Sequence, residues 1–193
     1  MTTMNLVWPA REYLPGYVDA LERGWTSDNL RGASVARDHL ARIARDADAF
    51  LAGLVDRHGG APIALPDGSI VSRLPGYQRW MWDGAFCGSI GFRWQPGTEA
   101  LPPYCLGHIG YAVVPWKEGR GYATEALRRT LLDIRPEGLR YVEITTRPDN
   151  LASQRIIEKN GGVFVEEFTM HASLGGHREL RYRIDLGRHD RPA

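Results

Sequence analysis

The spacing of apolar positions separates the chain into helical and extended segments. Apolar side chains recur every three to four residues over 12–24 and, more regularly, over 34–57, and this spacing predicts two amphipathic helices. A short apolar stretch over 5–8 predicts a strand ahead of them. Between 61 and 76 the repeated prolines and glycines predict a surface connection, with no regular structure beyond a short strand at Ile70-Val71.

Residues 77–93 predict the clearest hairpin. Two extended runs flank Asp83-Gly84, a dipeptide that suits a tight two-residue turn because both positions tolerate positive φ. Side chains alternate between the two faces of a strand, so Tyr77 and the pair Trp80 and Trp82 cannot all face the same side.

The last third of the chain predicts three more strands and a helix. The strands cover 139–146, 163–170 and 179–186, and the helix covers 151–159. A turn is expected at 174–177 and a loose tail at 188–193.

Residues 106–127, LGHIGYAVVPWKEGRGYATEAL, carry most of the functional signal. Residues 108–114 suit an extended chain and the helical period begins at Ala123, so a strand feeds a helix through a loop that holds Gly119 and Gly121. The first N–H groups of such a helix lack internal partners, and the helix dipole is positive at this end. Glycines let a ligand approach the backbone closely. The stretch therefore predicts an anion site suited to a group such as a pyrophosphate.

Composition narrows the class of protein without naming a ligand. The chain carries 24 Lys and Arg against 23 Asp and Glu, which gives no reason to expect nucleic acid or a membrane surface as a partner. No stretch approaches the roughly 20 apolar residues of a membrane span, and no signal-peptide pattern opens the chain, so we expect a cytoplasmic protein. Cys87 and Cys105 lack metal-ligand spacing and are expected to be reduced thiols. Residues 1–187 are expected to form a single domain.

The predicted order is β-α-α-β-β-β-α-β-α-β-β. This order defines an α/β fold (an α+β mixed sheet) with a central, mostly antiparallel sheet flanked by helices. The only convincing strand-loop-helix anion site in that order lies at 106–127.

Two motifs and this element order resemble the GNAT superfamily of acetyl-CoA-dependent N-acetyltransferases. The family's signature, Arg/Gln-x-x-Gly-x-Gly/Ala after the fourth strand, is matched by Glu118-Gly119-Arg120-Gly121-Tyr122-Ala123 except at Glu118. The stretch Asn150-Leu151-Ala152-Ser153 through Glu158-Lys159-Asn160-Gly161-Gly162 is similar to the family's Asn-x-x-Ser/Ala helix, which ends in Glu-Lys-x-Gly-Phe. The phrase GHIGY at 107–111 is closest to the branch that includes acetyltransferases of ribosomal-protein N-termini.

The resemblance implies acetyl-CoA as the cosubstrate and no metal. The loop would hold the pyrophosphate through backbone N–H groups, so Glu118 is tolerable there, and Lys117 and Arg120 would supply charge beside it. Strand residues would present backbone groups to the pantetheine arm and the thioester oxygen. The implied cofactor-binding set is Tyr111, Ala112, Val113, Lys117, Glu118, Gly119, Arg120, Gly121, Tyr122, Ala123, Asn150 and Ser153.

Three positions bear on the chemistry and leave alternatives open. Related sequences often carry Glu at the position of His108, and an imidazole near its ordinary pKa can accept a proton at neutral pH. His108 is therefore either the general base, directly or through water, or a structural residue of the sheet. Asn150 either contacts the pantetheine arm or caps the following helix. Many members use a Tyr to protonate the thiolate where this chain has Ile157.

The acceptor is expected to be a primary amine of a small molecule, peptide or protein N-terminus. Aromatic residues of the hairpin either pack in the core or line the acceptor site, and four carboxylates could attract a cationic amine or belong to the solvated surface: Asp83, Glu99, Glu166 and Glu167. A homodimer is plausible by family habit. A non-catalytic acyl-CoA-binding or regulatory domain on the same scaffold is the alternative, whereas a phosphate-loop hydrolase is excluded because no Gly-Lys-Ser/Thr follows the loop.

Overall fold

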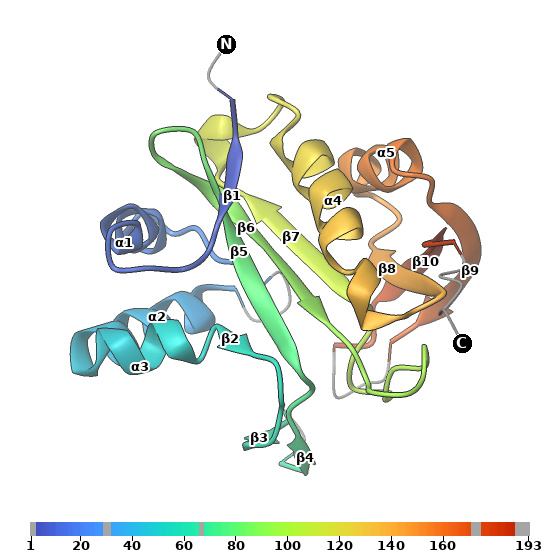
Figure 1. Cartoon of the computed structure of the whole chain (residues 1–193), viewed down its shortest axis with the longest axis horizontal. Helices are drawn as coiled ribbons and strands as arrows, with labels where there is room; N and C mark the ends of the chain where they lie inside the picture. The colour runs from blue at the N-terminus through green and yellow to red at the C-terminus, as the bar shows by residue number, and fades with distance from the viewer. Residues whose placement is uncertain (1–2, 29–31, 66–67, 171–174, 188–193) are drawn as a thin grey trace.

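Two antiparallel sheets form the framework of the chain (Figure 1). The computed structural model describes residues 3–28, 32–65, 68–170 and 175–187. The first sheet has the order β1 (Asn5–Val7), β5 (Gly76–Trp82), β6 (Phe86–Arg93) and β7 (Ile109–Val113), and β2 (Val55–Asp56) also pairs with β5. The second has the order β8 (Tyr141–Thr146), β10 (Arg178–Asp185) and β9 (Val163–Thr169). A separate short pair joins β3 (Pro62–Ala64) to β4 (Ile70–Ser72).

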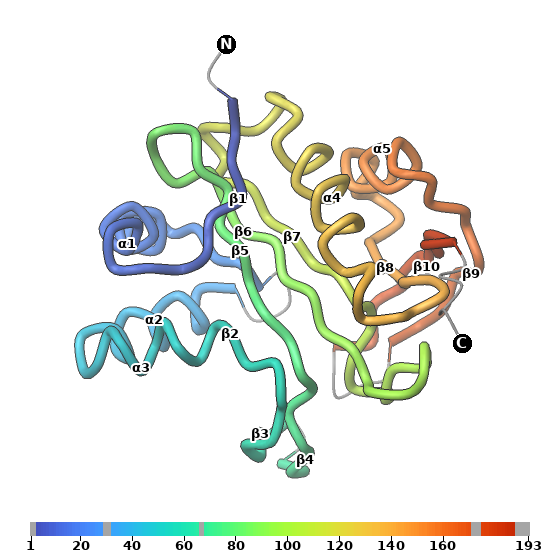
Figure 2. The backbone as a smooth tube through the Cα atoms, viewed as in Figure 1, coloured from blue at the N-terminus to red at the C-terminus, as the bar shows by residue number. Residues whose placement is uncertain are grey.

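Helices lie on both sides of this framework. On one side are α1 (Leu14–Glu22), α2 (Ala33–Arg45) and α3 (Ala47–Ala52). On the other are α4 (Tyr122–Asp133) and α5 (Leu151–Lys159), and the tube in Figure 2 shows α4 crossing in front of the strands. Short 3-10 turns, Pro115–Lys117 and Arg135–Glu137, precede and follow α4.

Side chains of the first sheet divide between two apolar cores, because successive strand residues point to opposite faces. Tyr77 and Met81 join the core that contains Leu127 of α4, whereas Trp80 and Trp82 join the core of α1 to α3. The expected separation of Tyr77 from the two tryptophans is therefore confirmed. Trp80 is fully buried and stacks on Tyr17 with ring centroids 4.7 Å apart, so these aromatic residues serve mainly as core.

Most predicted elements are confirmed, and the helix α5 has the predicted bounds. The strands predicted over 5–8, 139–146, 163–170 and 179–186 appear as β1, β8, β9 and β10. The expected α/β class, with antiparallel pairing and flanking helices, is also confirmed. Apart from the separate pair of β3 and β4, the described strands form two sheets rather than one central sheet. The turn expected at 174–177 and the tail at 188–193 fall partly or wholly outside the described residues.

The single long helix predicted over 34–57 is wrong. Asp46 leaves the helical conformation, with φ −160° and ψ 99°, and its carboxylate accepts a hydrogen bond from the backbone N–H of Ala49 at 2.9 Å. Asp competes for backbone donors in this way and favours helix starts over helix interiors. The helix therefore divides into α2 and α3, and the chain then leaves α3 to pair β2 with β5.

Two turn predictions are also corrected. Trp82 pairs with Phe86, so the hairpin loop contains three residues and not two. Gly84 has a φ of 106°, but no described non-glycine residue has a positive φ, so Asp83 does not adopt the conformation that the two-residue turn requires. The connection at 61–76 holds the small hairpin of β3 and β4, more structure than expected.

Cys87 and Cys105 are free thiols in the described part of the chain. Among the described residues, no helix is long and apolar enough to cross a membrane.

Candidate functional site

The connection between β7 and α4 has the conformation that an anion-binding loop requires. Gly119 and Gly121 have φ values of 73° and 79°, in the left-handed region where a side chain is strained. A Cβ at either glycine would meet no atom within 4 Å. Glycine is therefore needed for the backbone path, and the space beside both residues is open.

The loop and the first turn of α4 leave a continuous run of backbone N–H groups without partners. Within the described chain, the N–H groups of residues 119–124 donate to no protein acceptor, and the first bond into the helix runs from Glu125 to the carbonyl of Gly121 at 3.0 Å. No side chain caps this end of α4. Unpaired donors at a helix N-terminus, together with the positive end of the helix dipole, favour an anion.

The charge of Lys117 is compensated by a carboxylate from the hairpin loop. The Lys117 ammonium forms an ion pair with one oxygen of Asp83, and the Tyr122 hydroxyl donates to the other at 2.7 Å. Although burial acts to raise it, the hydrogen bonds from Lys117 and Tyr122 lower the pKa of Asp83 to about 2. Arg120 and Glu118 are exposed beside the loop. Lys117 and Arg120 are the two cations predicted to supply charge to the loop. Among the described residues, Lys117 forms an ion pair with a carboxylate and Arg120 does not.

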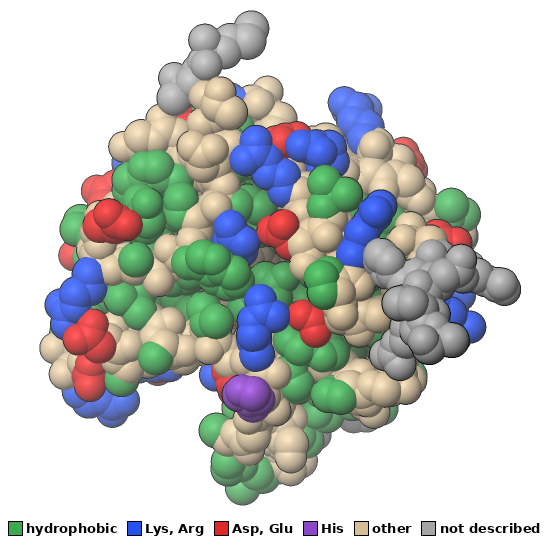
Figure 3. Space-filling model, in the orientation of Figure 1, with side chains coloured by type: hydrophobic (Ala, Val, Ile, Leu, Met, Phe, Trp, Pro, Cys, Tyr) green, Lys and Arg blue, Asp and Glu red, His purple; other side chains and the backbone are tan. Residues whose placement is uncertain are grey.

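Other charged side chains are engaged in ion pairs. Arg128 donates twice to Glu125, at 2.8 Å each. The acidic residues considered for the acceptor are also in ion pairs: Glu99 with Arg140, Glu166 with Arg181 and Glu167 with Arg178. Figure 3 shows basic side chains over the part of the surface where α4 and α5 lie, with fewer acidic ones between them.

The two sheets meet at the start of β7, the end of this strand that lies away from the loop. The strands β7 and β8 belong to different sheets and form no ladder in the described chain. They are joined just before β7, where the His108 N–H donates to the Glu143 carbonyl at 2.7 Å. A Cβ at Gly107 would lie 3.0 Å from that carbonyl, so the close approach depends on glycine.

The hydrogen-bonding pattern of β7 separates Ala112 from Tyr111 and Val113, the three strand residues predicted to contact the donor. The Val114 N–H donates to Cys87 and the Arg93 N–H to the His108 carbonyl, both on the β6 side. Because backbone groups alternate along an antiparallel strand, the groups of Ala112 are used within the first sheet. Those of Tyr111 and Val113 point away from β6, toward the side on which β8 lies.

The helix α5 is tied to β7 through a side-chain contact. The Tyr111 hydroxyl lies 2.9 Å from the Ser153 hydroxyl, and burial raises the pKa of Tyr111 to about 12. The Asn150 side chain accepts from the Ser153 N–H at 3.0 Å and so caps α5. Ile157 is fully buried in the core and supplies no proton.

His108 is fully buried, and its geometry favours the structural alternative. Its Nδ1 accepts a hydrogen bond from the Glu143 N–H at 3.0 Å. The neutral ring therefore carries its proton on Nε2, which has no partner among the described residues. Burial lowers the pKa of His108 to about 4. Neither nitrogen is free to accept a proton in this state, so the role of general base finds no support in the geometry.

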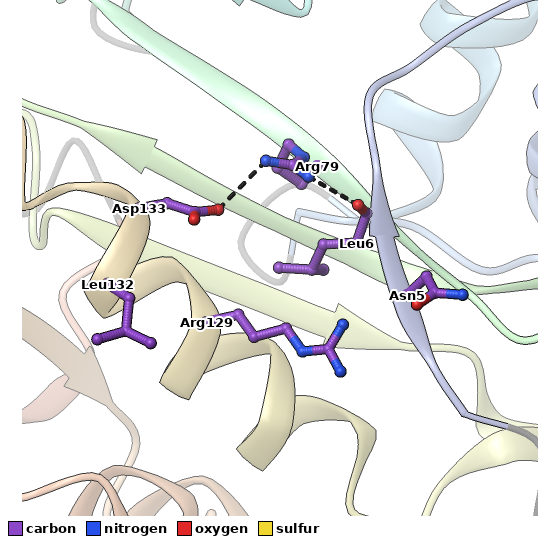
Figure 4. A pocket seen from close by; sticks show the side chains of 6 residues that line it. All are labelled: Asn5, Leu6, Arg79, Arg129, Leu132 and Asp133. Carbon is purple, nitrogen blue, oxygen red and sulfur yellow. Dashed lines mark hydrogen bonds and ion pairs between the residues drawn. The ribbon is translucent and has the colours of Figure 1, made fainter.

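A hollow elsewhere on the surface offers no comparable chemistry. A volume of about 200 Å³ lies between β1, β5 and the second half of α4 (Figure 4). Its Arg79 donates to Asp133 at 3.2 Å and to the Leu6 carbonyl at 2.7 Å. The described residues contain no group of three or more His, Cys, Asp or Glu side chains that could hold a metal ion.

Sequence reasoning missed the contacts of Asp83 and Glu143. The sequence predicts Asp83 as a turn residue and as either an attractor for an amine or a solvated surface charge, whereas its pairing with Lys117 joins residues 34 apart in sequence. Glu143 receives Arg181 and Arg183 side chains at 2.9 and 2.8 Å. No local pattern signals either pairing.

The fold and this loop define a class: an α/β protein in which one strand of a separated pair leads into a helix through a loop with unpartnered backbone N–H groups in the described chain. Residues 68–163 match the family model described as Acetyltransferase (GNAT) domain, a range that includes β7, the loop, α4, β8 and α5. The chain belongs to the GNAT superfamily of acetyltransferases. Comparison with curated proteins finds no sequence match.

Solved structures with the same fold cover nearly the whole chain. The ribosomal L7/L12 alpha-N-protein acetyltransferase RimL in complex with coenzyme A has a TM-score of 0.62 at 15% identity, over 96% of this chain and 95% of that one. The acetyltransferase from Salmonella typhimurium that modifies the N-terminal serine of that ribosomal protein has a TM-score of 0.57 at 15% identity, over 96% of each chain. The microcin C7 self-immunity acetyltransferase MccE, in complex with acetyl-CoA and AMP, has a TM-score of 0.58 at 12% identity, over 94% and 92%. At these identities the likeness concerns the fold.

Proposed function

We propose that the chain is an N-acetyltransferase that moves an acetyl group from acetyl-CoA to a primary amine. The observation that carries the proposal is the run of unpartnered N–H groups over 119–124, at the start of α4 and beside two glycines with open space. Such a run matches the several acceptor oxygens of a pyrophosphate. Membership in the GNAT superfamily, and the coenzyme A or acetyl-CoA in the structures of RimL and MccE, support acetyl-CoA as the donor.

In this proposal the chain binds the donor mainly through its backbone. Residues 119–124 bind the pyrophosphate, and Arg120 adds an exposed positive charge beside it. The outward backbone groups of Tyr111 and Val113 hydrogen-bond the pantetheine arm, as they would a neighbouring strand. The cap formed by Asn150 holds the start of α5, where Ser153 contacts Tyr111.

The transfer itself is an attack of an unprotonated amine on the thioester carbonyl. The new C–N bond forms, the C–S bond breaks and the thiolate of coenzyme A leaves with the electron pair. An outward N–H of β7 stabilises the negative charge on the carbonyl oxygen. Since Ile157 is apolar and His108 is enclosed, we assign the proton steps to water. Catalysis then rests on holding the amine against the thioester.

The acceptor is proposed at the level of a primary amine. RimL and the Salmonella typhimurium enzyme act on a protein N-terminus, according to their names, and this class of acceptor, together with small-molecule and peptide amines, defines the panel to test.

Thiol release tests the proposal. Purified protein is incubated with acetyl-CoA and a panel of amines, and free coenzyme A is detected with a thiol reagent. We expect release with at least one amine, and coenzyme A binding that weakens in Arg120→Ala but not in the control Arg128→Ala, whose guanidinium is paired with Glu125. Binding without turnover across a broad panel would favour the alternative, a non-catalytic acyl-CoA-binding domain. No binding of coenzyme A would refute both.

A further inference from the structure

We propose that Asp83 is a positioning residue that holds the loop over 118–121 in its anion-binding conformation before any ligand arrives. This inference rests on the proposed function, because it concerns the loop assigned to the pyrophosphate. Asp83 lies at the tip of the β5–β6 hairpin, far from the loop in sequence.

The two oxygens of one carboxylate hold both ends of the loop. One oxygen receives the Lys117 ammonium, from the last residue of the 3-10 turn before the loop. The other receives the Tyr122 hydroxyl at 2.7 Å, from the first residue of α4. Between these anchors lie only Glu118, Gly119, Arg120 and Gly121. Asp83 therefore fixes the distance between the two ends of the segment that carries the glycines.

The anchor is shielded from solvent, unlike the loop. The Asp83 and Lys117 side chains are 9% and 13% exposed, whereas Gly119, Arg120 and Gly121 are exposed. Within the described chain, no backbone hydrogen bond joins two residues of the segment 118–121. A segment with two glycines and no internal bonds would otherwise lose conformational entropy on binding. Fixing its ends beforehand removes part of that cost from the binding step.

Asp83 also has an opposing electrostatic effect. It neutralises Lys117 beside the site, so its removal frees a positive charge that attracts an anion. A substitution of Asp83 alone therefore changes the affinity for coenzyme A in two opposite ways: the loop is no longer held in position, and the freed Lys117 attracts the anion more strongly. Removing both charges together leaves the net charge near the loop unchanged and isolates positioning.

The test is the dissociation constant of coenzyme A, measured by calorimetry at several salt concentrations, for the double variant Asp83→Asn/Lys117→Met. We expect it to rise by about threefold to tenfold, on the scale of one or two lost hydrogen bonds, with an unchanged salt dependence. The matched control is Arg11→Met/Asp48→Asn, which removes an exposed ion pair without net charge change and should bind as the unmodified protein does.

A second variant covers the case in which the double variant does not fold. Tyr122→Phe removes only the hydroxyl that Asp83 receives, and it should raise the same dissociation constant by about threefold. Its control is Tyr104→Phe, which removes a hydroxyl bonded to the Ser72 carbonyl and should leave binding unchanged.

The outcomes separate the two levels of proposal. Unmodified protein that does not bind coenzyme A refutes the proposed function. Unmodified protein that binds, with variants that bind equally well or more tightly, refutes the positioning role of Asp83, whatever happens to their melting temperatures.

Discussion

His108 makes a quantitative prediction about stability in acid. Its pKa is about 4 in the folded chain against 6.5 as the ordinary value, because burial disfavours the charged ring. Between these two values the unfolded chain binds a proton that the folded chain does not. The contribution of His108 to the free energy of unfolding is therefore fully present above pH 6.5. It falls as the pH drops toward 4, by about 1.4 kcal/mol per pH unit and about 3 kcal/mol in all.

The variant His108→Asn isolates this contribution. Asn Oδ1 can accept from the Glu143 N–H as His108 Nδ1 does at 3.0 Å, but the amide does not titrate. At pH 7.5 the variant should be less stable by about 1–3 kcal/mol, since a buried ring is replaced by a smaller group. Between pH 7.5 and 4 the difference from the unmodified protein should shrink by about 3 kcal/mol.

Urea unfolding across this pH range provides the measurement. The control is His58→Asn, at an exposed histidine, measured over the same pH range. A difference between His108→Asn and the unmodified protein that stays constant from pH 7.5 to 4 would refute the reasoning. If His108→Asn instead abolished the acid limb of kcat/KM without a stability change, the general-base hypothesis would be restored.

Substitutions at three further positions probe the chain around the site. Gly121→Ala should cost about 1–2 kcal/mol of stability, because its φ of 79° strains any residue with a Cβ, as a urea titration would show. Asn150→Ala should lower the free energy of unfolding by about 1 kcal/mol, because it removes the cap of α5. Asn150→Ser should restore this stability, since serine also caps a helix. If the serine variant is stable but binds coenzyme A more weakly than the unmodified protein, Asn150 also contacts the pantetheine arm. Gly162→Ala should lower the melting temperature strongly, since its Cβ would lie 2.3 Å from Ile157 Cγ2, and an unchanged melt would show that α5 shifts freely.

Local patterns predicted the elements whose signals are local. The helix α5 was predicted with its bounds because an Asn cap and a Gly-Gly stop enclose one apolar face. The loop between β7 and α4 was predicted for the same reason, from two glycines between a strand and a helix. The spacing of apolar residues continues past Asp46, but the helix ends there. The Asp46 carboxylate accepts a hydrogen bond from the Ala49 N–H, and this interrupts the helix.

Long-range contacts were beyond such patterns. The pairing of Asp83 with Lys117 depends on how the hairpin packs against the loop, and the burial of His108 depends on the meeting of two sheets. The sequence left His108 open between a base and a structural residue because solvation decides the pKa, and solvation is a property of the whole fold. The residues proposed for acetyl-CoA remain predictions until binding is measured.

The separation of β7 from β8 has a thermodynamic consequence. These strands are joined at His108 and Glu143 and form no ladder beyond that point in the described chain, so a donor molecule bound between them would hydrogen-bond where a neighbouring strand otherwise would. A ligand that binds only the folded state stabilises it by about 2.7 kcal/mol at a hundred times its dissociation constant. Under the proposed function, the stability of the folded chain in a cell would then depend on the concentration of acetyl-CoA. In a cell with little acetyl-CoA, a larger fraction of the protein would unfold.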